Sequence, residues 1–244
     1  ALVPDEQVGR RFLRSMRPLV RAGHAYMNRV LDVNCEGDRY FVVYALLDGA
    51  PLRDVLESRR ARGRGFTVAE ALPVFEQIAA LTVEADVAVH GSYSPENVFV
   101  MPEHIKVLDA GLATALPAAA VAHRLRMRRN VREYLAPELR RGARPSARSD
   151  VYALGALLGE MLTQVTYDGR PEMFREVDPD LPDEVDSLLR RALLSDPRGR
   201  HADARELYEA LAECAGVAPS PSAAPRVAAP PSGDDGFDVV EEQA

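Results

Sequence analysis

Two short apolar segments, each bounded by polar residues, limit most strongly what this chain can fold into. Val98–Met101 and Ile105–Leu108 are each long enough for one short strand, and a proline-containing turn separates them. A polar loop that ends at Asn97 leads into the first segment, and Asp109 ends the second. The sequence therefore predicts a small hairpin that lets Asn97 and Asp109 face one point in space.

The rest of the chain is predicted to be largely helical, with a second pair of strands near its start. Residues 5–22 carry apolar side chains at three- and four-residue steps, which indicates an amphipathic helix. Arg29–Val33 and Tyr40–Tyr44 predict strands, with a turn at 34–38 between them. Further helices are predicted at 51–56, 67–88 (capped by Thr67), 151–163 (with Ser149 and Asp150 as possible caps), 181–194 and 202–212, and a loop is predicted to about Glu138.

The composition excludes several classes of protein. The chain has 244 residues, 47 % of them hydrophobic and 27 % charged, which is typical of a globular domain that can bury a core. Only Cys35 and Cys214 are cysteines and they lack metal-ligand spacing, so a reducing cytoplasm fits. No apolar run is long enough for a membrane span, and a net charge of −7 argues against nucleic-acid binding. The start lacks the order of a signal peptide, and Ala1 in place of Met suggests an excised piece.

Residues 217–244 differ in composition from everything before them. They are rich in proline and alanine and then become acidic, and they offer few large side chains to bury. The sequence predicts a disordered linker followed by an acidic tail. An inert tether is the simpler interpretation. The alternative is a docking peptide, for which Gly236–Val240 is the one plausible contact motif.

Asn97 and Asp109 are the residues of the predicted hairpin that could carry chemistry. Both offer hard oxygen donors, the kind that Mg²⁺ takes together with phosphate oxygens. The pair therefore predicts a magnesium site, and ordinary turn residues beside strands are the alternative.

Six segments match, in order and spacing, the motifs of one enzyme family. They are His90–Asn97 against H-R-D-L-K-P-E-N, Asp109–Gly111 against D-F-G, Tyr134–Glu138 against A-P-E, Ser149–Gly155, Asp196–Arg200 against D-P-x-x-R, and Tyr40–Leu52. On these residues, roughly from residue 8 to residue 214, the sequence resembles the eukaryotic-like (bacterial-type) Ser/Thr protein kinase family.

The resemblance implies an α+β, protein kinase-like fold. A mostly helical C-lobe (48–216) would follow an incomplete, two-stranded N-lobe (1–47) through a hinge near Ala45 to Leu47. It also implies a structural ion pair between Glu138 and Arg200. Asp150 is expected to be a cap or a loop anchor, and His90 a structural histidine. The family's nucleotide contacts fall on Ala45, Leu47, Phe99, Asn97 and Asp109, the last two being the metal positions.

The sequence departs from the family at its reacting centre. The catalytic Asp that accepts the substrate proton is here Ser92, and the Lys that meets the transferred phosphate is Ser94. The family's glycine-rich loop and its strand lysine have no counterpart in the chain. Lys106, which is the chain's single lysine, lies in the wrong strand to replace that lysine. The Glu of the first helix is Ser15, and the Phe of D-F-G is Ala110.

These departures predict a catalytically impaired kinase domain, or pseudokinase, that acts in signalling as a protein-binding or regulatory scaffold. ATP and Mg²⁺ would then bind weakly or not at all. The alternative is an active Ser/Thr protein kinase whose glycine loop and lysine lie upstream of this chain. A small-molecule phosphotransferase of the aminoglycoside-kinase type is a third possibility, but the A-P-E segment, Asp150 and Arg200 speak against it.

The segment between Asp109 and Glu138 carries a partner prediction. Residues 115–133 contain no Ser, Thr or Tyr, so phosphorylation cannot order this segment. They contain instead Arg124, Arg126, Arg128 and Arg129, which predict capture of an acidic or phosphorylated protein. A solvated basic face is an equally good alternative.

Overall fold

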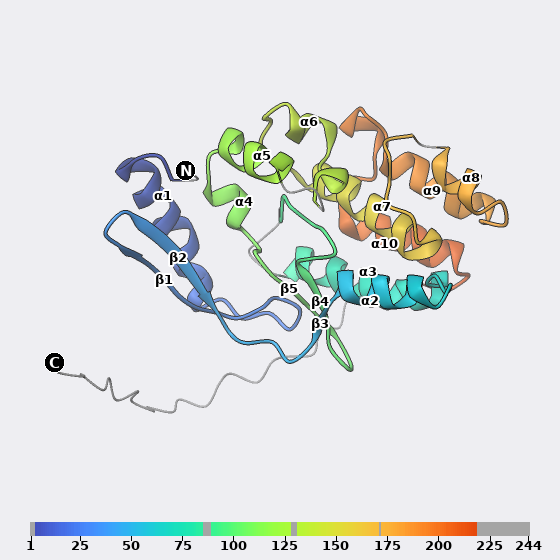
Figure 1. The fold of residues 1–244 in the computed structure, drawn as a ribbon, viewed down its shortest axis with the longest axis horizontal. Helices are drawn as coiled ribbons and strands as arrows, with labels where there is room; N and C mark the ends of the chain where they lie inside the picture. The colour runs from blue at the N-terminus through green and yellow to red at the C-terminus, as the bar shows by residue number, and fades with distance from the viewer. Residues whose placement is uncertain (1–2, 85–88, 128–130, 171, 219–244) are drawn as a thin grey trace.

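The computed structural model of this protein describes residues 3–84, 89–127, 131–170 and 172–218. Two parts are visible in Figure 1: a small one built from α1, β1 and β2, and a larger, mostly helical one. The first part holds α1 (Glu6–Met16), the 3₁₀ turn η1 (Arg17–Val20), β1 (Val30–Glu36) and β2 (Arg39–Tyr44). The linker and tail predicted at 217–244 lie, from residue 219 onward, outside the described residues.

The small part is one antiparallel hairpin with a helix against it. β1 pairs with β2 in a two-stranded sheet, as predicted, but the turn is shorter than 34–38 because the strands continue to Glu36 and from Arg39. Gly37 has a φ of 61°, which suits the first position of a two-residue hairpin turn. α1 covers one face, where Phe12 meets the Tyr40 ring edge to face at 6.1 Å. A side chain on Gly9 would collide with that ring, so glycine permits the close approach.

A second, three-stranded sheet opens the larger part. Its order is β3 (Ala50–Pro51), β4 (Val98–Val100) and β5 (Ile105–Val107), all antiparallel. The predicted hairpin is therefore confirmed. No strand was predicted at Ala50–Pro51, yet these residues pair with Val100 and Phe99, and the helix expected from residue 51 begins at Leu52. Proline is tolerated there because β3 is an edge strand, whose outward side needs no donor.

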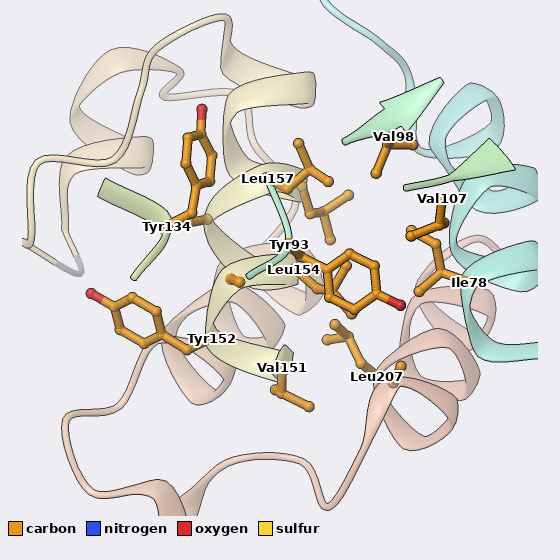
Figure 2. Packing of buried hydrophobic residues seen from close by; sticks show 14 of the residues in the cluster. Ile78, Tyr93, Val98, Val107, Tyr134, Val151, Tyr152, Leu154, Leu157 and Leu207 are labelled. Atoms are coloured by element: carbon orange, nitrogen blue, oxygen red, sulfur yellow. The ribbon is translucent and has the colours of Figure 1, made fainter. Parts of the chain in front are cut away.

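The helices of the larger part surround one buried helix, α7. The buried helix α7 spans Ala147–Thr163. The elements before it are α2 (Leu52–Ala61), α3 (Val68–Glu84), α4 (Leu112–Ala115), α5 (Ala118–Met127), the 3₁₀ turn η2 (Arg132–Tyr134) and α6 (Pro137–Arg140). The elements after it are α8 (Met173–Val177), α9 (Asp183–Ala192), the 3₁₀ turn η3 (Pro197–Gly199) and α10 (Ala204–Cys214). Leu154 and Leu157 of α7 are fully buried. Ile78 of α3 and Leu207 of α10 belong to the same core (Figure 2).

The cap of α7 differs from the expected one. Ser146 is the N-cap, and it exchanges hydrogen bonds with Ser149 in a capping box. Ser149 and Asp150 lie inside the first turn and are buried. The apolar pattern starts only at residue 151, so the sequence placed the helix start one turn too late.

The segment predicted as a loop up to Glu138 is largely helical. α5 forms over a run of alanines, which are the strongest helix formers. Val121 and Ala122 bury one side of α5. The apolar stripe of α5 is too short to show a helical periodicity. The high helix propensity of its alanines was the signal that could have predicted this helix.

Two further expectations are borne out in the larger part. Arg200 donates two parallel hydrogen bonds of 2.8 Å to the Glu138 carboxylate, and its side chain is fully buried. Thr67 and Glu70 form a capping box at the start of α3. Among the described residues, no helix is both long and apolar enough to cross a bilayer.

We expect acidification from about pH 6.5 to about pH 4 to lower the free energy of unfolding through His201. This residue is 1 % exposed, and burial, helped by the charge of Arg191, lowers its pKa to about 4 although Glu206 opposes the shift. An unfolded histidine gains its proton near pH 6.5, so the unfolded state binds protons first and stability falls by about 2–3 kcal/mol.

Urea unfolding across this pH range measures the effect. His201→Gln should flatten the slope, whereas His123→Gln, at an exposed position, should leave it unchanged. Equal slopes for the native chain and His201→Gln would contradict the assignment.

Candidate functional site

The backbone of the loop that enters β4 is anchored by hydrogen bonds to a single carboxylate. Asp150, in the first turn of α7, accepts hydrogen bonds from the backbone N–H groups of His90 at 2.8 Å and Gly91 at 2.7 Å. Asp150 is 2 % exposed, and burial raises its pKa to about 7, although the two N–H donors oppose that shift. The prediction that Asp150 anchors the loop is confirmed.

Gly91 is the tightest point of this loop. Its φ is +80°, in the region that side chains disfavour. A Cβ there would lie 2.7 Å from Pro145 and 2.8 Å from Ala113. Glycine therefore lets the loop pass between the segment before α7 and α4.

His90 is structural, as predicted. Its ring stacks on Tyr93 with centroids 4.2 Å apart, and its Nε2 lies 2.7 Å from the carbonyl oxygen of Leu108. Because Nε2 meets a carbonyl, it carries the proton, and Nδ1 is left as an acceptor for the Ser92 N–H at 3.2 Å. Burial lowers the pKa of His90, so the ring is neutral near pH 7.

Asn97 closes the loop on itself. Its Oδ1 accepts a hydrogen bond from the Ser94 N–H at 3.0 Å, and its Nδ2 donates to the Ser92 carbonyl at 2.7 Å. Its own carbonyl accepts from Leu108 N at 2.9 Å, which ties the loop to the end of β5. The structure thus brings Asn97 to the end of β5, directly before Asp109.

Asp109 follows β5 in an unusual backbone conformation. Its φ is 61°, and it is one of two residues other than glycine in this region among the described residues. Its side chain lies near Tyr44, the last residue of β2. Burial, and then the Asp109 charge, raise the pKa of the Tyr44 hydroxyl. Sequence reasoning missed Tyr44; the signal was a large polar side chain at the end of a strand, directly before the hinge.

The comparisons with known proteins agree with this geometry. The family model described as protein tyrosine and serine/threonine kinase matches residues 4–219. The chain belongs to the protein kinase family.

Bacterial relatives and a solved structure extend the comparison. The chain is 28 % identical to the serine/threonine-protein kinase PrkC of Bacillus subtilis, over 83 % of this chain and 33 % of that protein. It is 30 % identical to PknL of Mycobacterium tuberculosis, over 86 % and 56 %. A crystal structure of a variant of the M. tuberculosis PknI kinase domain matches with a TM-score of 0.70 at 25 % identity, covering 88 % of this chain and 81 % of that one. The chain therefore spans a third to just over half of these curated relatives.

In this kinase domain Ser92 and Ser94, which the sequence analysis matched to the family's Asp and Lys, are buried to different degrees. Ser92 is half-buried, and its Oγ is 3.4 Å from His90 Nδ1. Ser94 is 2 % exposed, so its hydroxyl lies inside the loop rather than at the surface. Position 94 therefore carries no charge, and its hydroxyl is buried within the loop.

The predicted nucleotide contacts lie around the hinge. The backbone of Ala45 is already engaged, since its N–H donates to Arg29 O at 2.9 Å and its carbonyl accepts from Asn28 Nδ2 at 3.2 Å. Leu47 and Phe99 are half-buried, Phe99 on β4. These positions stay predictions as nucleotide contacts.

The fit of Mg²⁺ to Asn97 and Asp109 can be judged from Asn97. Its Oδ1 suits the ion: it accepts one hydrogen bond from the Ser94 N–H and keeps a second lone pair, while Nδ2 fixes the orientation of the amide by donating to the Ser92 carbonyl. Mg²⁺ usually takes only one or two protein ligands together with phosphate oxygens. Asn97 and Asp109 stay a prediction as metal ligands, and no step of a reaction is derived through them.

Arg53 makes a network that the sequence did not reveal. From α2 it contacts Glu96 of the loop at 3.2 Å, Glu160 of α7 at 2.8 Å and the Tyr134 hydroxyl at 2.9 Å. Tyr134 also donates a short hydrogen bond to Glu160. One side chain therefore joins α2, the loop, η2 and α7. The family motifs contain no signal for it, because Arg53 lies outside all of them.

The side chains of the predicted arginine cluster lie outside the described residues. Arg124 and Arg126 lie on α5, but their side chains are outside the described residues, as are Arg128 and Arg129 altogether. Lys106 is placed: its Nζ lies 3.5 Å from Met27 O, and burial lowers its pKa.

We expect Asp150→Ala to destabilise the chain by roughly 2–4 kcal/mol, because it leaves two buried N–H groups without an acceptor. Denaturant unfolding measures the loss. Asp168→Ala is the matched control, since that carboxylate is exposed and accepts its hydrogen bonds from the backbone and side chain of the exposed Arg170. A loss for Asp150→Ala no larger than for the control would show that Asp150 does not hold the loop.

Proposed function

We propose that this kinase domain is catalytically impaired and works by binding other proteins in a regulatory role. The observation that carries the proposal is Ser92, which stands where the family has its general base. A serine hydroxyl is not ionised near neutrality. A positioned base accelerates such reactions about 10²–10⁴-fold, so its loss costs roughly 3–5 kcal/mol of barrier.

The surroundings of Ser92 support the proposal. Ser94 replaces a cation at the reacting centre and is buried. Asn97 holds the loop backbone through both ends of its amide. The loop keeps its shape while the groups that perform the transfer are absent, which is the expected state of a domain retained for binding. Weak or absent ATP and Mg²⁺ binding, a cytoplasmic location and an acidic or phosphorylated partner for Arg124, Arg126, Arg128 and Arg129 belong to this proposal.

The second candidate is an active Ser/Thr protein kinase, with its glycine loop and lysine upstream of this chain. One local contact favours it: Ser92 Oγ lies 3.4 Å from His90 Nδ1, the unprotonated ring nitrogen. A substrate hydroxyl could pass its proton through Ser92 to His90. Burial lowers the pKa of His90, however, so the ring would be a weak base.

The named relatives favour the second candidate over the first. PrkC, PknL and PknI all carry the name of a kinase, and likeness to them supports ATP-dependent phosphoryl transfer to proteins. The two candidates share the fold, and turnover is the measurement that separates them most directly.

We expect the intact protein to transfer no phosphate from Mg-ATP to itself or to generic protein substrates above background. Radiolabelled ATP with the native protein, Asp109→Ala and Ser92→Ala measures this, with Asp168→Ala as the exposed control. Turnover that is lost in Asp109→Ala and kept in Asp168→Ala would overturn the impaired-domain proposal. Its additional loss in Ser92→Ala would support the relay through His90.

A further inference from the structure

One short segment of the chain carries a charge opposite to that of the whole. Residues 7–31 contain six arginines and no Asp or Glu, so they carry +6 in a chain whose net charge is −7. All the other residues together therefore carry −13. Such a separation of charge makes the surface of this segment attractive to anionic groups. All six arginines are exposed: Arg10, Arg11, Arg14, Arg17, Arg21 and Arg29.

Four of these arginines form a row along α1 and η1. Arg10, Arg14 and Arg17 follow one another at steps of four and three residues, so they share one face of the helix. Arg21 continues the row four residues further on, directly after η1. We call these four residues the α1 arginine row. At about 1.5 Å of rise per residue, the row is about 17 Å long.

The α1 arginine row faces away from the hairpin. The buried side chains of the same helix are Phe12, Met16 and Leu19, which recur at their own steps of four and three residues. At about 100° per residue, the two rows lie on opposite sides of the helix. Any strand that extends the β1–β2 sheet lies on the buried side, beside the hairpin (Figure 1). The exposure of the arginine row is therefore independent of how many strands that sheet has.

Within the described residues, the arginine row has little acidic company. Arg10 pairs with Glu6 at 3.1 Å, in an exposed contact within α1. Arg17 Nε lies 3.4 Å from the backbone carbonyl oxygen of Val33, which carries no full charge. No carboxylate of the described residues pairs with Arg14 or Arg21. The row thus presents guanidinium groups that are free to bind carboxylates, the geometry for which arginine is best suited.

We propose that the α1 arginine row binds the chain's own acidic segment, residues 234–242. This segment carries five acids in nine residues and no base: Asp234, Asp235, Asp238, Glu241 and Glu242. Its charge of −5 is complementary to that of the row, and complementary charge both steers an encounter and fixes its register. Nine extended residues span about 30 Å, so the segment is long enough to bring an acid to each arginine of the row.

The tether permits this contact. The last described residue is Ala218, and the 16 residues from there to Asp234 span up to about 50 Å when extended. That reach is about three times the radius of gyration of about 17 Å expected for a domain of this size. A flexible tether supplies an effective concentration of about 1 mM, so a weak electrostatic contact suffices. A free acidic protein at lower concentration competes poorly with a tethered segment.

Docking of the tail makes the outer face of α1 a regulated surface. Another acidic protein reaches the arginine row only after it displaces residues 234–242. The helix also packs against α4, which begins three residues after Asp109, so the covered helix is a direct neighbour of the candidate site. The inference is independent of whether the domain transfers phosphate.

Competition between the tethered tail and a free copy of it tests the proposal. A peptide of residues 231–244 with a neutral fluorophore should bind the 1–232 chain, which keeps every described residue, with a dissociation constant of about 0.2 mM in about 50 mM NaCl. The full 1–244 chain should bind the peptide about fivefold more weakly, because its own tail occupies the row. About 500 mM NaCl should weaken binding to the 1–232 chain at least about tenfold, because the Debye length falls to about 4 Å.

Removal of the row's charge should abolish the contact without unfolding the helix. Arg10→Gln, Arg14→Gln and Arg21→Gln together should weaken peptide binding to the 1–232 chain at least about tenfold, since glutamine keeps the helix propensity and removes the charge. Arg17 is left in place because it also contacts the backbone of Val33. The melting temperature should stay that of the parent chain.

Three arginines elsewhere provide the matched control. Arg62→Gln, Arg64→Gln and Arg144→Gln remove the same charge from other exposed positions and should leave peptide binding within about twofold of the parent. Equal weakening in the two triple variants would overturn the proposal, because net charge alone would then explain binding. Equal peptide affinity in the 1–232 and 1–244 chains would also overturn it, because the tail would then leave the row open.

Vesicles distinguish the tail from a membrane as the occupant. The probe is a vesicle with about 30 % phosphatidylglycerol in phosphatidylcholine, mixed with the 1–232 chain. Vesicle binding that disappears in the α1 triple variant, together with no binding of the peptide, would identify an anionic membrane as the ligand of the row and overturn the tail as its occupant.

Discussion

The buried carboxylate of Asp150 is the contact on which the site depends. It is linked to the loop across 60 residues of sequence through the backbone of His90 and Gly91, not through their side chains. A hydrogen bond to a backbone N–H group does not depend on which side chain the residue carries. The loop can therefore keep its shape whichever side chains stand at positions 92 and 94. This separation of frame from chemistry is what makes an impaired domain physically possible.

Buried arginines extend the same logic through the larger part. Arg200 links Glu138 to the segment before α10, and Arg53 links the loop to α2 and α7. Buried ion pairs often contribute little net stability, because desolvation offsets the Coulomb attraction, whereas removing one partner is strongly unfavourable. The role of the Arg200 and Arg53 ion pairs is to determine which helices and loops pack against one another. Arg59, by contrast, is half-exposed, and its pair with Glu70 only reinforces the start of α3.

The sequence predicted those parts of the structure whose cause is local or whose motif is specific. The hairpin before Asp109 and the strands around Gly37 follow from short patterns, and the Glu138–Arg200 pair follows from the resemblance to the kinase family. What it missed depends on partners distant in the chain. Ala50 and Pro51 form a strand only because Val100 and Phe99 lie beside them. Arg53 matters only because Glu160, more than a hundred residues later, reaches it. The helix α5 was missed because its alanines have high propensity but too short an apolar stripe.

The small part reaches the candidate site through one strand of its hairpin. α1 covers one face of the hairpin and is held close by Gly9, and local side chains close the outer edge of β1. Among the described residues, the uncovered face of the hairpin carries Leu31 of β1 together with Phe41 and Val43 of β2. The same strand carries Tyr44 to the carboxylate of Asp109. Tyr44 is therefore the residue through which the small part meets the candidate site.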